Sequence, residues 1–494
     1  MDIHIQYCVW TFATLLACYF YVNIFVWRLN EWYYNMKLRK KQYPLPPGHL
    51  GWPLIGNMIA FVRDFKSGHP DSFINNLISR YGRTGIYKSH LFGSPSIIIS
   101  DADLCRRVLT NDENFKTGYP KSTLKLIKCT KSYWSSSREN QKRFKRPITS
   151  VLMGHNTLEM YLTRMEDIVI NSLEELSSMS HPVDFLKEMK NISFDIIIEI
   201  FIGSYNQHIV TKIGNSFTEI YSALWSMPIN FPGFAFHKGL LAREKLAKLV
   251  QPIVEERRLM KRNGDKKDLL DIILEVRDEE DGWKPEDEDI ADVMIGYVLA
   301  GHETIANAMM WSIIYLTKNP HVLKKAKEEQ EEIIKKRLPT QKQSSLKEIK
   351  QMVYLSHIIN EVLRLISMNF ANFREATRDV NINGYIIPKG WKVLAWARAV
   401  HMDPTYYSNP DEFNPSRWND HNAKVGTFFP FGAGSMHCPG SDLTKIQISI
   451  FLHHFLLNYK LERVNPECPI TYLPSSKPKD NCLAKVIKVS SVGA

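Results

Sequence analysis

The sequence has few cysteines, and it lacks the spacings that would make them a structural framework. Seven cysteines form an odd, widely spaced set with no Cys-x-x-Cys pair, which excludes a disulfide scaffold and indicates a reducing compartment. Low-complexity tracts and internal repeats are also missing, so a solenoid or a disordered chain is excluded. No segment has the pattern of a nucleic-acid-binding module.

The chain is long and carries a large positive net charge. The chain has 494 residues, enough to bury a large core and to hold a cofactor away from solvent. Its net charge of +11 gathers in two clusters, at 37–41 and 142–146. We interpret the first cluster as facing a membrane surface and the second as meeting an acidic protein partner. Two solvated faces are the alternative.

The N-terminal region carries a long uncharged run, from Ile5 to Trp27. A helix of this length matches the hydrocarbon core of a bilayer, and aromatic residues at 32–34 would form an interfacial belt. Basic residues follow the run, which predicts a cytosolic main domain. We therefore expect a transmembrane anchor with its belt over 1–34, a basic, proline-rich hinge over 35–52 and one large domain over 53–494. A cleaved signal peptide is the alternative.

Helical periodicity dominates the large domain. It predicts helices over 159–178, 194–202, 245–261, 289–318 and 321–335, with short β-branched strands at 96–100 and 385–387. The expected fold class is mainly α with small β-sheets.

Residues 431–440 place one cysteine in a glycine-rich loop. Gly434 and Gly440 permit a tight turn, and Phe431 offers an apolar face. The negative charge of a Cys438 thiolate would be favoured by the start of a helix predicted over 441–457. This pattern indicates a metal held by a single thiolate. A buried structural cysteine is the alternative.

Two further motifs lie upstream. Residues 300–304 set an acid–alcohol pair, Glu303 and Thr304, beside a glycine on the long predicted helix, where the pair could relay protons. Glu361 and Arg364 share one helical face and can pair.

Together these motifs resemble the cytochrome P450 family. The resemblance covers essentially the whole chain and implies a P450 fold behind an N-terminal transmembrane helix. It also implies haem b with Cys438 as the axial thiolate, a monooxygenase that takes electrons from NADPH through a separate P450 reductase, and anchoring in the endoplasmic reticulum membrane with a cytosolic catalytic domain.

The resemblance assigns roles to individual residues. Thr304 and Glu303 would be catalytic, and Glu361, Arg364 and Arg417 would form a structural ion-pair triad. The haem contacts implied are Cys438, Phe431, Gly434, Gly440, Arg374, Lys145 and Gln141. Trp134 with Arg138 is an alternative register for the last two. Met436 stands where the family usually has an arginine that meets a propionate, which puts haem affinity in question.

Helical spacing and family placement also give candidate pocket residues: Val293, Tyr297, Ala300, Asn369, Phe370, Asn372 and Ser475. Tyr297 and the two asparagines are polar for an unfunctionalised terpene pocket, which hints at an oxygenated substrate. Asparagines that cap turns outside the pocket are the alternative.

Several segments most resemble the plant branch of ent-kaurenoic acid oxidases and, within it, legume β-amyrin 11-oxidases; they include 67–76, 381–391 and 482–490. The function implied is oxidation of a lipophilic terpenoid, a β-amyrin-type pentacyclic triterpene at C-11. Ent-kaurenoic acid oxidation in gibberellin biosynthesis and an impaired, non-oxidising paralogue are the alternatives. The reductase would dock on Lys142, Arg143, Lys145 and Arg146.

Overall fold

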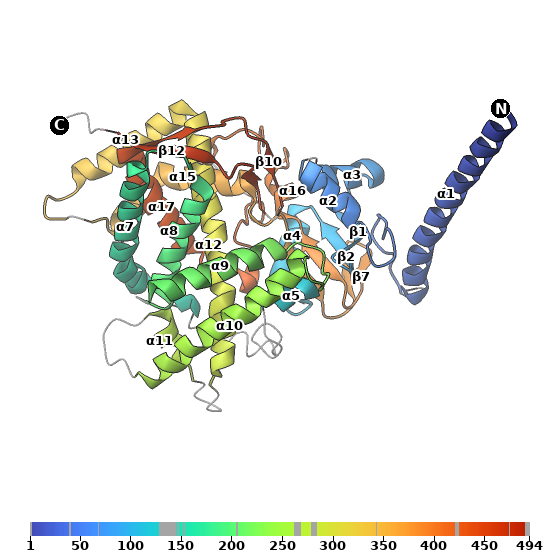
Figure 1. Cartoon of the computed structure of the whole chain (residues 1–494), viewed down its shortest axis with the longest axis horizontal. Helices are drawn as coiled ribbons and strands as arrows, with labels where there is room; N and C mark the ends of the chain where they lie inside the picture. Colours follow the sequence, from blue (N-terminus) through green and yellow to red (C-terminus); the bar gives the residue numbers. More distant parts are fainter. Residues whose placement is uncertain are drawn as a thin grey trace. The chain divides into compact units, whose positions relative to one another are not determined.

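The computed structural model describes residues 2–38, 41–67, 69–127, 145, 148–150, 152, 154–203, 206–260, 268–277, 284–341, 343–419, 424–473 and 475–489. The chain forms two compact units. One comprises 1–120, 369–406 and 424–436, and the other comprises 121–368, 407–423 and 437–494. Long helices with short strands between them make up most of the described chain (Figure 1). The expected mainly-α class with small sheets is confirmed.

The first unit is built on a five-stranded sheet in the order β1-β2-β8-β5-β3. Its strands are β1 (Ile86–Leu91), β2 (Ser94–Ile99), β3 (Phe115–Thr117), β5 (Asn372–Ala376) and β8 (Lys392–Ala395). Only β2 and β8 pair in parallel. The β-branched run at 97–99 is fully buried, because both faces of this strand are covered. The remaining elements are α2 (Met58–Ser67), α3 (Ser72–Tyr81), α4 (Ala102–Thr110), β6 (Val380–Ile382), β7 (Tyr385–Ile387), α16 (Ala397–His401) and the 3-10 turn η2 (Gly434–Met436).

The N-terminal helix α1 (Asp2–Leu38) belongs to the first unit and packs onto it by its last third. The Asn30 side-chain amide donates to the Gly51 carbonyl at 3.0 Å, and Glu31 pairs with Lys88 at 2.9 Å. None of the described helices is both long enough and apolar enough to cross a membrane. The predicted transmembrane helix is therefore not found; the run includes amide and hydroxyl side chains, which lower its mean hydropathy.

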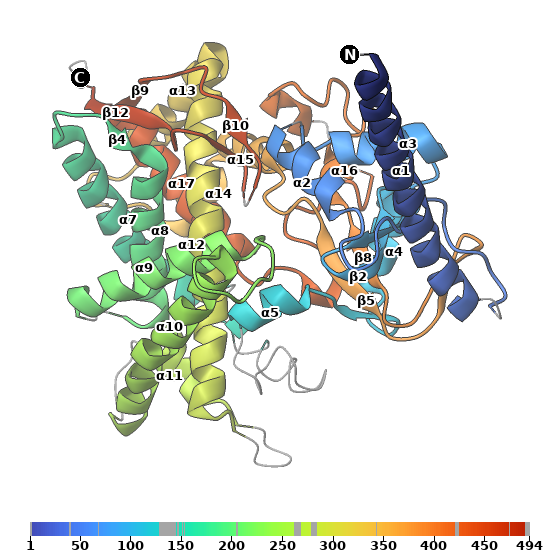
Figure 2. The same ribbon diagram turned by 45° about the vertical axis from the view of Figure 1, so that its right-hand side comes forward.

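The second unit is a helix assembly around α12 (Asp287–Lys318). Figure 2 shows α12 running through this unit beside α8 (Phe185–Phe201) and α17 (Ser441–Asn458), both of which it contacts. The other helices are α5 (Lys121–Ile127), α7 (His155–Ser178), α9 (Gln207–Ala223), α10 (Ala235–Leu259), α11 (Leu269–Leu274), α13 (Pro320–Lys336), α14 (Leu346–Gln351), α15 (Val353–Ile366) and η1 (Pro415–Trp418). The strands are β4 (Val183–Asp184), β9 (Tyr459–Arg463), β10 (Ile470–Thr471), β11 (Lys477–Pro478) and β12 (Leu483–Lys488).

Helix α8 begins nine residues before the prediction, at Phe185 rather than Phe194. Asp184 caps it, since its carboxylate accepts a hydrogen bond from the Lys187 N–H at 2.9 Å. Asp184 lies outside the apolar periodicity on which the predicted helix rests. The extra turns matter because they carry Lys190 to the site described below.

Candidate active site

The middle of α12 presents a narrow accessible stripe on an otherwise buried helix. From Ile290 to Ile314 every residue is buried except Tyr297, Ala300, Gly301 and Thr304. Their spacing of three and four residues places them on one helical face. Tyr297, Ala300 and Thr304 were predicted pocket or catalytic positions. The other two predicted positions on this helix, Val293 and Glu303, are buried.

Gly301 allows the close approach of a neighbouring helix. A β-carbon added at this position would lie 2.9 Å from the Ile197 side chain of α8, which is too close for two carbon atoms. The end of the Ile197 side chain therefore packs directly over Gly301, and an added methyl group would make that side chain turn aside.

The acid–alcohol pair divides between two faces of α12. The Thr304 hydroxyl lies on the accessible stripe and donates to the Ala300 carbonyl at 2.8 Å. The Glu303 side chain is 1 % exposed and pairs with Lys190 of α8, its carboxylate oxygen 2.8 Å from the ammonium nitrogen. Its neighbour His302 is also buried, and burial lowers the pKa of that imidazole. Sequence reasoning missed Lys190, because no local pattern links positions 190 and 303.

Cys438 lies three residues before the start of α17, in the second unit. Burial raises the pKa of its thiol; the backbone N–H of Gly440 and the cation of Lys145 act in the opposite direction without cancelling that effect. The Lys145 ammonium donates to the His437 carbonyl at 3.2 Å. An N–H donor and a cation beside a sulfur are the surroundings that a thiolate ligand needs.

The glycine-rich turn before the cysteine belongs to the first unit. Gly434 has a φ of +72°, and a β-carbon there would lie 2.4 Å from the Leu109 carbonyl oxygen. Only glycine tolerates both the positive φ and this close approach. Phe431 is half-buried, as is Met436.

Arg374, on β5, is a buried guanidinium without a carboxylate partner among the described residues. It donates to the Phe373 carbonyl at 3.2 Å. Burial lowers the pKa of Arg374, and the charges of Tyr119 and Asp112 offset this only in part. A buried cation of this kind favours an anionic group of a ligand.

The predicted triad is assembled within the second unit. Arg364 meets both carboxylate oxygens of Glu361, at 2.8 and 3.0 Å, and Arg417 reaches the same carboxylate at 2.9 Å. The Trp418 indole adds a fourth hydrogen bond, at 3.0 Å.

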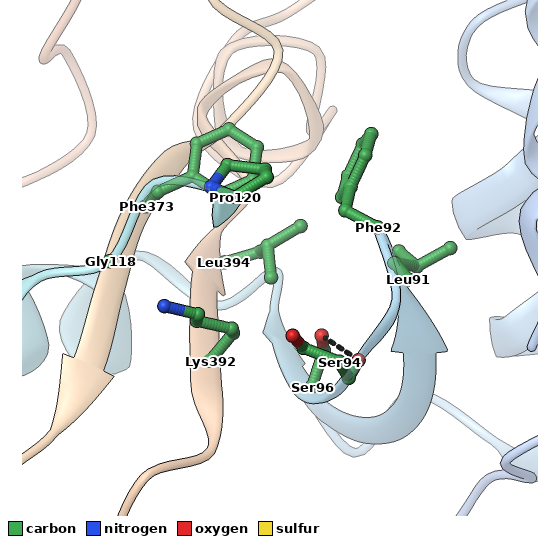
Figure 3. A pocket seen from close by; sticks show the side chains of 9 residues that line it. All are labelled: Leu91, Phe92, Ser94, Ser96, Gly118, Pro120, Phe373, Lys392 and Leu394. Carbon is green, nitrogen blue, oxygen red and sulfur yellow. Dashed lines mark hydrogen bonds between the residues drawn. The ribbon is translucent and has the colours of Figure 1, made fainter. Parts of the chain in front are cut away.

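The predicted pocket residues of the first unit lie around β5. Asn369 is exposed, Asn372 is half-buried, and Phe370 packs its ring against Phe65 and Trp396. Figure 3 shows a pocket in this unit that contains none of them; its lining residues are Leu91, Phe92, Ser94, Ser96, Gly118, Pro120, Phe373, Lys392 and Leu394. Because side chains alternate along a strand, Asn372 and Arg374 face away from the side of β5 that Phe373 presents to this pocket.

The remaining predicted positions divide between the second unit and the undescribed part of the chain. Ser475 is buried and hydrogen-bonds the hydroxyl of Tyr221, whose pKa is raised by burial and by the charge of Glu303. Gln141 and the alternative pair Trp134 and Arg138 lie outside the described residues. So do three members of the basic cluster, Lys142, Arg143 and Arg146.

A cysteine with donors around its sulfur, an acid–alcohol pair on a long helix, and a helical fold with small sheets define the haem-thiolate class of oxidative enzymes. The family comparison agrees, since the Cytochrome P450 family matches residues 46–482. The chain belongs to the cytochrome P450 family and is a monooxygenase, with haem held by a cysteine thiolate and an NADPH-dependent reductase as electron donor.

Individual relatives give a finer comparison. The chain is 64% identical to beta-amyrin 11-oxidase of Glycyrrhiza uralensis over 97% of this chain and 98% of that protein. It is 47% identical to ent-kaurenoic acid oxidase 2 of Arabidopsis thaliana over 93% and 94% of the two chains. The structure of retinoic acid bound cyanobacterial CYP120A1 superposes with a TM-score of 0.81 at 26% identity, covering 91% of this chain and all of that one.

Proposed function

We propose that this P450 oxidises a β-amyrin-type pentacyclic triterpene at C-11. The observation that carries the proposal is the 64% identity to a beta-amyrin 11-oxidase along nearly the full length of both chains. Identity to an ent-kaurenoic acid oxidase is much lower, at 47%, so the triterpene is favoured over the kaurenoid. The accessible stripe on α12 offers a mostly small surface where a rigid apolar skeleton could lie.

In this proposal the haem supplies oxygen activation and the insertion of oxygen into an unactivated C–H bond. The chain's own residues would bind the haem and deliver protons. Cys438 would hold the haem iron through its thiolate, and Gly440 directs its N–H at the sulfur. Arg374 and Lys145 would neutralise the propionates. Thr304 on the accessible stripe and the buried Glu303 would deliver protons.

The test is co-expression in yeast with a plant P450 reductase, with β-amyrin and ent-kaurenoic acid supplied in parallel. We expect an 11-oxidised triterpene by mass spectrometry and no oxidised kaurenoid. A product from ent-kaurenoic acid alone would overturn the substrate assignment. Cys438→Ser should abolish both the product and the thiolate-type carbon monoxide spectrum, whereas Cys468→Ser is the matched control.

We also propose that the protein is attached to the endoplasmic reticulum membrane by α1, with the catalytic part in the cytosol. The side chains of Trp10, Phe12, Leu15 and Phe25 are more than half exposed on α1, which is typical of a surface that lipid covers. Deletion of 1–34 should move the protein from the membrane pellet to the supernatant after high-speed centrifugation of the lysate. Retention of the shortened chain in the pellet would contradict attachment through α1.

The basic cluster at Lys142, Arg143, Lys145 and Arg146 is proposed as the reductase docking site. Reversal of Lys142 and Arg143 to glutamate should slow reduction of the haem and flatten its dependence on salt. Unchanged reduction would discard this docking site. Lys142 and Arg143 are chosen rather than Lys145, because Lys145 also lies beside Cys438 and a change there would alter the surroundings of the sulfur.

A further inference from the structure

A small cavity in the first unit lies between α2, α3 and the segment that follows α1. It shares no residue with the candidate active site or with the pocket of Figure 3. Its volume is about 70 Å³, whereas one ordered water needs about 10–15 Å³. The cavity can therefore hold a small polar group. Its lining residues are His49, Asn57, Ala60, Arg63, Asp64, Phe73, Asn76, Leu77 and Arg80.

The side chain of His49 connects this cavity to α1. Its ring centre lies 5.0 Å from that of Trp27 on α1 and 6.2 Å from that of Tyr81. Trp27 is 37 % exposed, and Trp32 and Tyr33, further along α1, are more than half exposed. Tryptophan and tyrosine gather where lipid headgroups meet water. With α1 attached to the bilayer as proposed above, the cavity lies at the level of the headgroups.

The lining of the cavity carries one more positive than negative charge. Asp64 is buried, and its carboxylate lies 3.0 Å from the Arg63 guanidinium and accepts a hydrogen bond from the Asn76 amide at 3.2 Å. Arg80 completes the lining, and no carboxylate among the described residues forms an ion pair with it. The surplus charge of Arg80 therefore favours a ligand with a single negative charge.

The imidazole of His49 offers a hydrogen bond rather than a further charge. Burial, followed by the charge of Arg80, lowers its pKa; the charge of Glu31 acts in the opposite direction, but Glu31 is itself paired with Lys88 at 2.9 Å. The Nδ1 atom of His49 is buried and has no hydrogen-bond partner among the described residues. A buried polar atom of this kind normally finds a ligand group or an ordered water.

The rest of the lining is largely apolar. Phe73 and Leu77 are 4 % and 5 % exposed, and Ala60 adds a methyl group from α2. A free inorganic phosphate gains little from such a surface, whereas an anion carried on an apolar body can bury its carbon atoms there. A guanidinium group matches the oxygen atoms of a phosphate. These features together suit a phospholipid that carries one net negative charge.

We propose that this cavity binds the phosphate group of an anionic membrane phospholipid. Arg80 contacts the phosphate oxygens, and His49 adds a hydrogen bond. The glycerol end of the lipid lies against Phe73 and Leu77. The bound lipid holds the first unit to the bilayer at a second point, next to α1. The inference rests on the membrane attachment through α1 that is proposed above.

The first experiment counts the lipids that remain on the full-length protein in native mass spectrometry. Phosphatidylglycerol, phosphatidylcholine and inorganic phosphate are each titrated against wild type, Arg80→Gln and the matched control Arg83→Gln in detergent. Arg83 is exposed and lies outside the cavity, so the control removes the same charge and leaves the lining intact. We expect one phosphatidylglycerol to bind wild type and Arg83→Gln at least about tenfold more tightly than Arg80→Gln, because a charge-assisted hydrogen bond is lost.

The other two ligands identify the source of the phosphate. Phosphatidylcholine carries a cation beside its phosphate and should bind wild type and Arg80→Gln alike. Inorganic phosphate lacks the apolar body and should neither bind with this affinity nor displace the lipid. Displacement of phosphatidylglycerol by an equal concentration of inorganic phosphate would assign the cavity to a soluble anion and overturn the lipid proposal.

A second variant separates the cavity from the charge. Ala60→Leu keeps Arg80 and fills part of the space, so it should also weaken the binding of phosphatidylglycerol while its unfolding midpoint stays near that of wild type. Binding equal to wild type in both Arg80→Gln and Ala60→Leu would show that the lipid is held elsewhere and would overturn the proposal.

The membrane pellet distinguishes this proposal from the attachment on which it rests. Arg80→Gln should stay in the pellet, because α1 is intact. Retention of the chain that lacks 1–34 would contradict attachment through α1, and it would leave the lipid count in detergent unchanged. Loss of the difference between Arg80→Gln and Arg83→Gln in that count would contradict the lipid site alone.

Discussion

The guanidinium of Arg364 and the carboxylate of Glu361 form a two-point ion pair in which both side chains are 0 % exposed. Such a pair is costly to desolvate, and it persists only because its remaining hydrogen-bonding positions are filled. The Glu361 carboxylate also accepts hydrogen bonds from Arg417, Trp418 and the Asn414 N–H. The Tyr407 ring covers the Arg364 guanidinium, with its centre 5.0 Å away.

Removing one member of this pair should be severe. Arg364→Met leaves the Glu361 charge buried, with an expected loss of about 3–5 kcal/mol in the free energy of unfolding. Urea unfolding measures this loss, and Lys324→Met is the control because its pair with Glu328 is exposed. A loss below about 1 kcal/mol for Arg364→Met, the range of surface pairs, would contradict the structural role.

Gly434→Ala should disrupt the turn that leads to Cys438. The substitution adds left-handed strain, about 1–2 kcal/mol, to a collision with the Leu109 carbonyl at 2.4 Å. Gly384→Ala separates the two effects, because Gly384 has a φ of +82° and no atom within 4 Å of the added carbon. We expect Gly384→Ala to retain haem and Gly434→Ala to lose it, as measured by the Soret absorbance per protein. Equal retention by both variants would show that the contact with Leu109 is unimportant.

Met436→Arg should slow the loss of haem. A guanidinium at this position would meet an anionic propionate, and a charge-assisted hydrogen bond contributes about 1.5–3 kcal/mol, which corresponds to roughly a tenfold slower dissociation or more. Transfer of haem to an apo-globin measures the rate, with Met436→Leu as the control for side-chain packing. If the wild type is purified with full haem occupancy and loses haem at the same rate as Met436→Arg, the impaired-paralogue alternative is excluded.

We expect the buried imidazole of His453 to lower the stability of the protein in mild acid. Burial lowers the pKa of this imidazole from 6.5 to about 3, and its Nδ1 lies 2.8 Å from the Gln330 side-chain oxygen. The folded state therefore disfavours protonated His453. The contribution of neutral His453 to the free energy of unfolding is complete above pH 6.5 and declines as the pH falls from 6.5 toward about 3. The unfolding free energy should fall by up to about 1.4 kcal/mol for each pH unit from this group.

The measurement compares urea unfolding of wild type and His453→Asn, which keeps an N–H near the Nδ1 position, at about pH 7 and about pH 5. The difference between the two proteins should shrink, or reverse in favour of the variant, at the lower pH. His321→Asn, an exposed position on α13, is the control. A pH dependence identical in all three proteins would exclude His453 as the responsible group.

Local signals in the sequence were enough for many elements. The predicted helix over 289–318 corresponds to Asp287–Lys318, and that over 321–335 to Pro320–Lys336, because a buried face repeats every 3.6 residues and is visible without the fold. Asp184 at the start of α8 shows the limit of such reading: a cap lies outside the apolar periodicity, so it must be sought separately.

By itself the sequence determined the family and the chemistry at the centre of the chain, because Cys438, Glu303 with Thr304, and Glu361 with Arg364 belong to short motifs whose spacing is their signal. Only the tertiary structure decided which side chains face each other across helices. It placed Lys190 against Glu303, turned Val293 into the core while Tyr297, Ala300 and Thr304 stay accessible, and paired Ser475 with Tyr221. The physical reason is that such contacts depend on the rotation and approach of whole helices, which the packing of many distant side chains sets together.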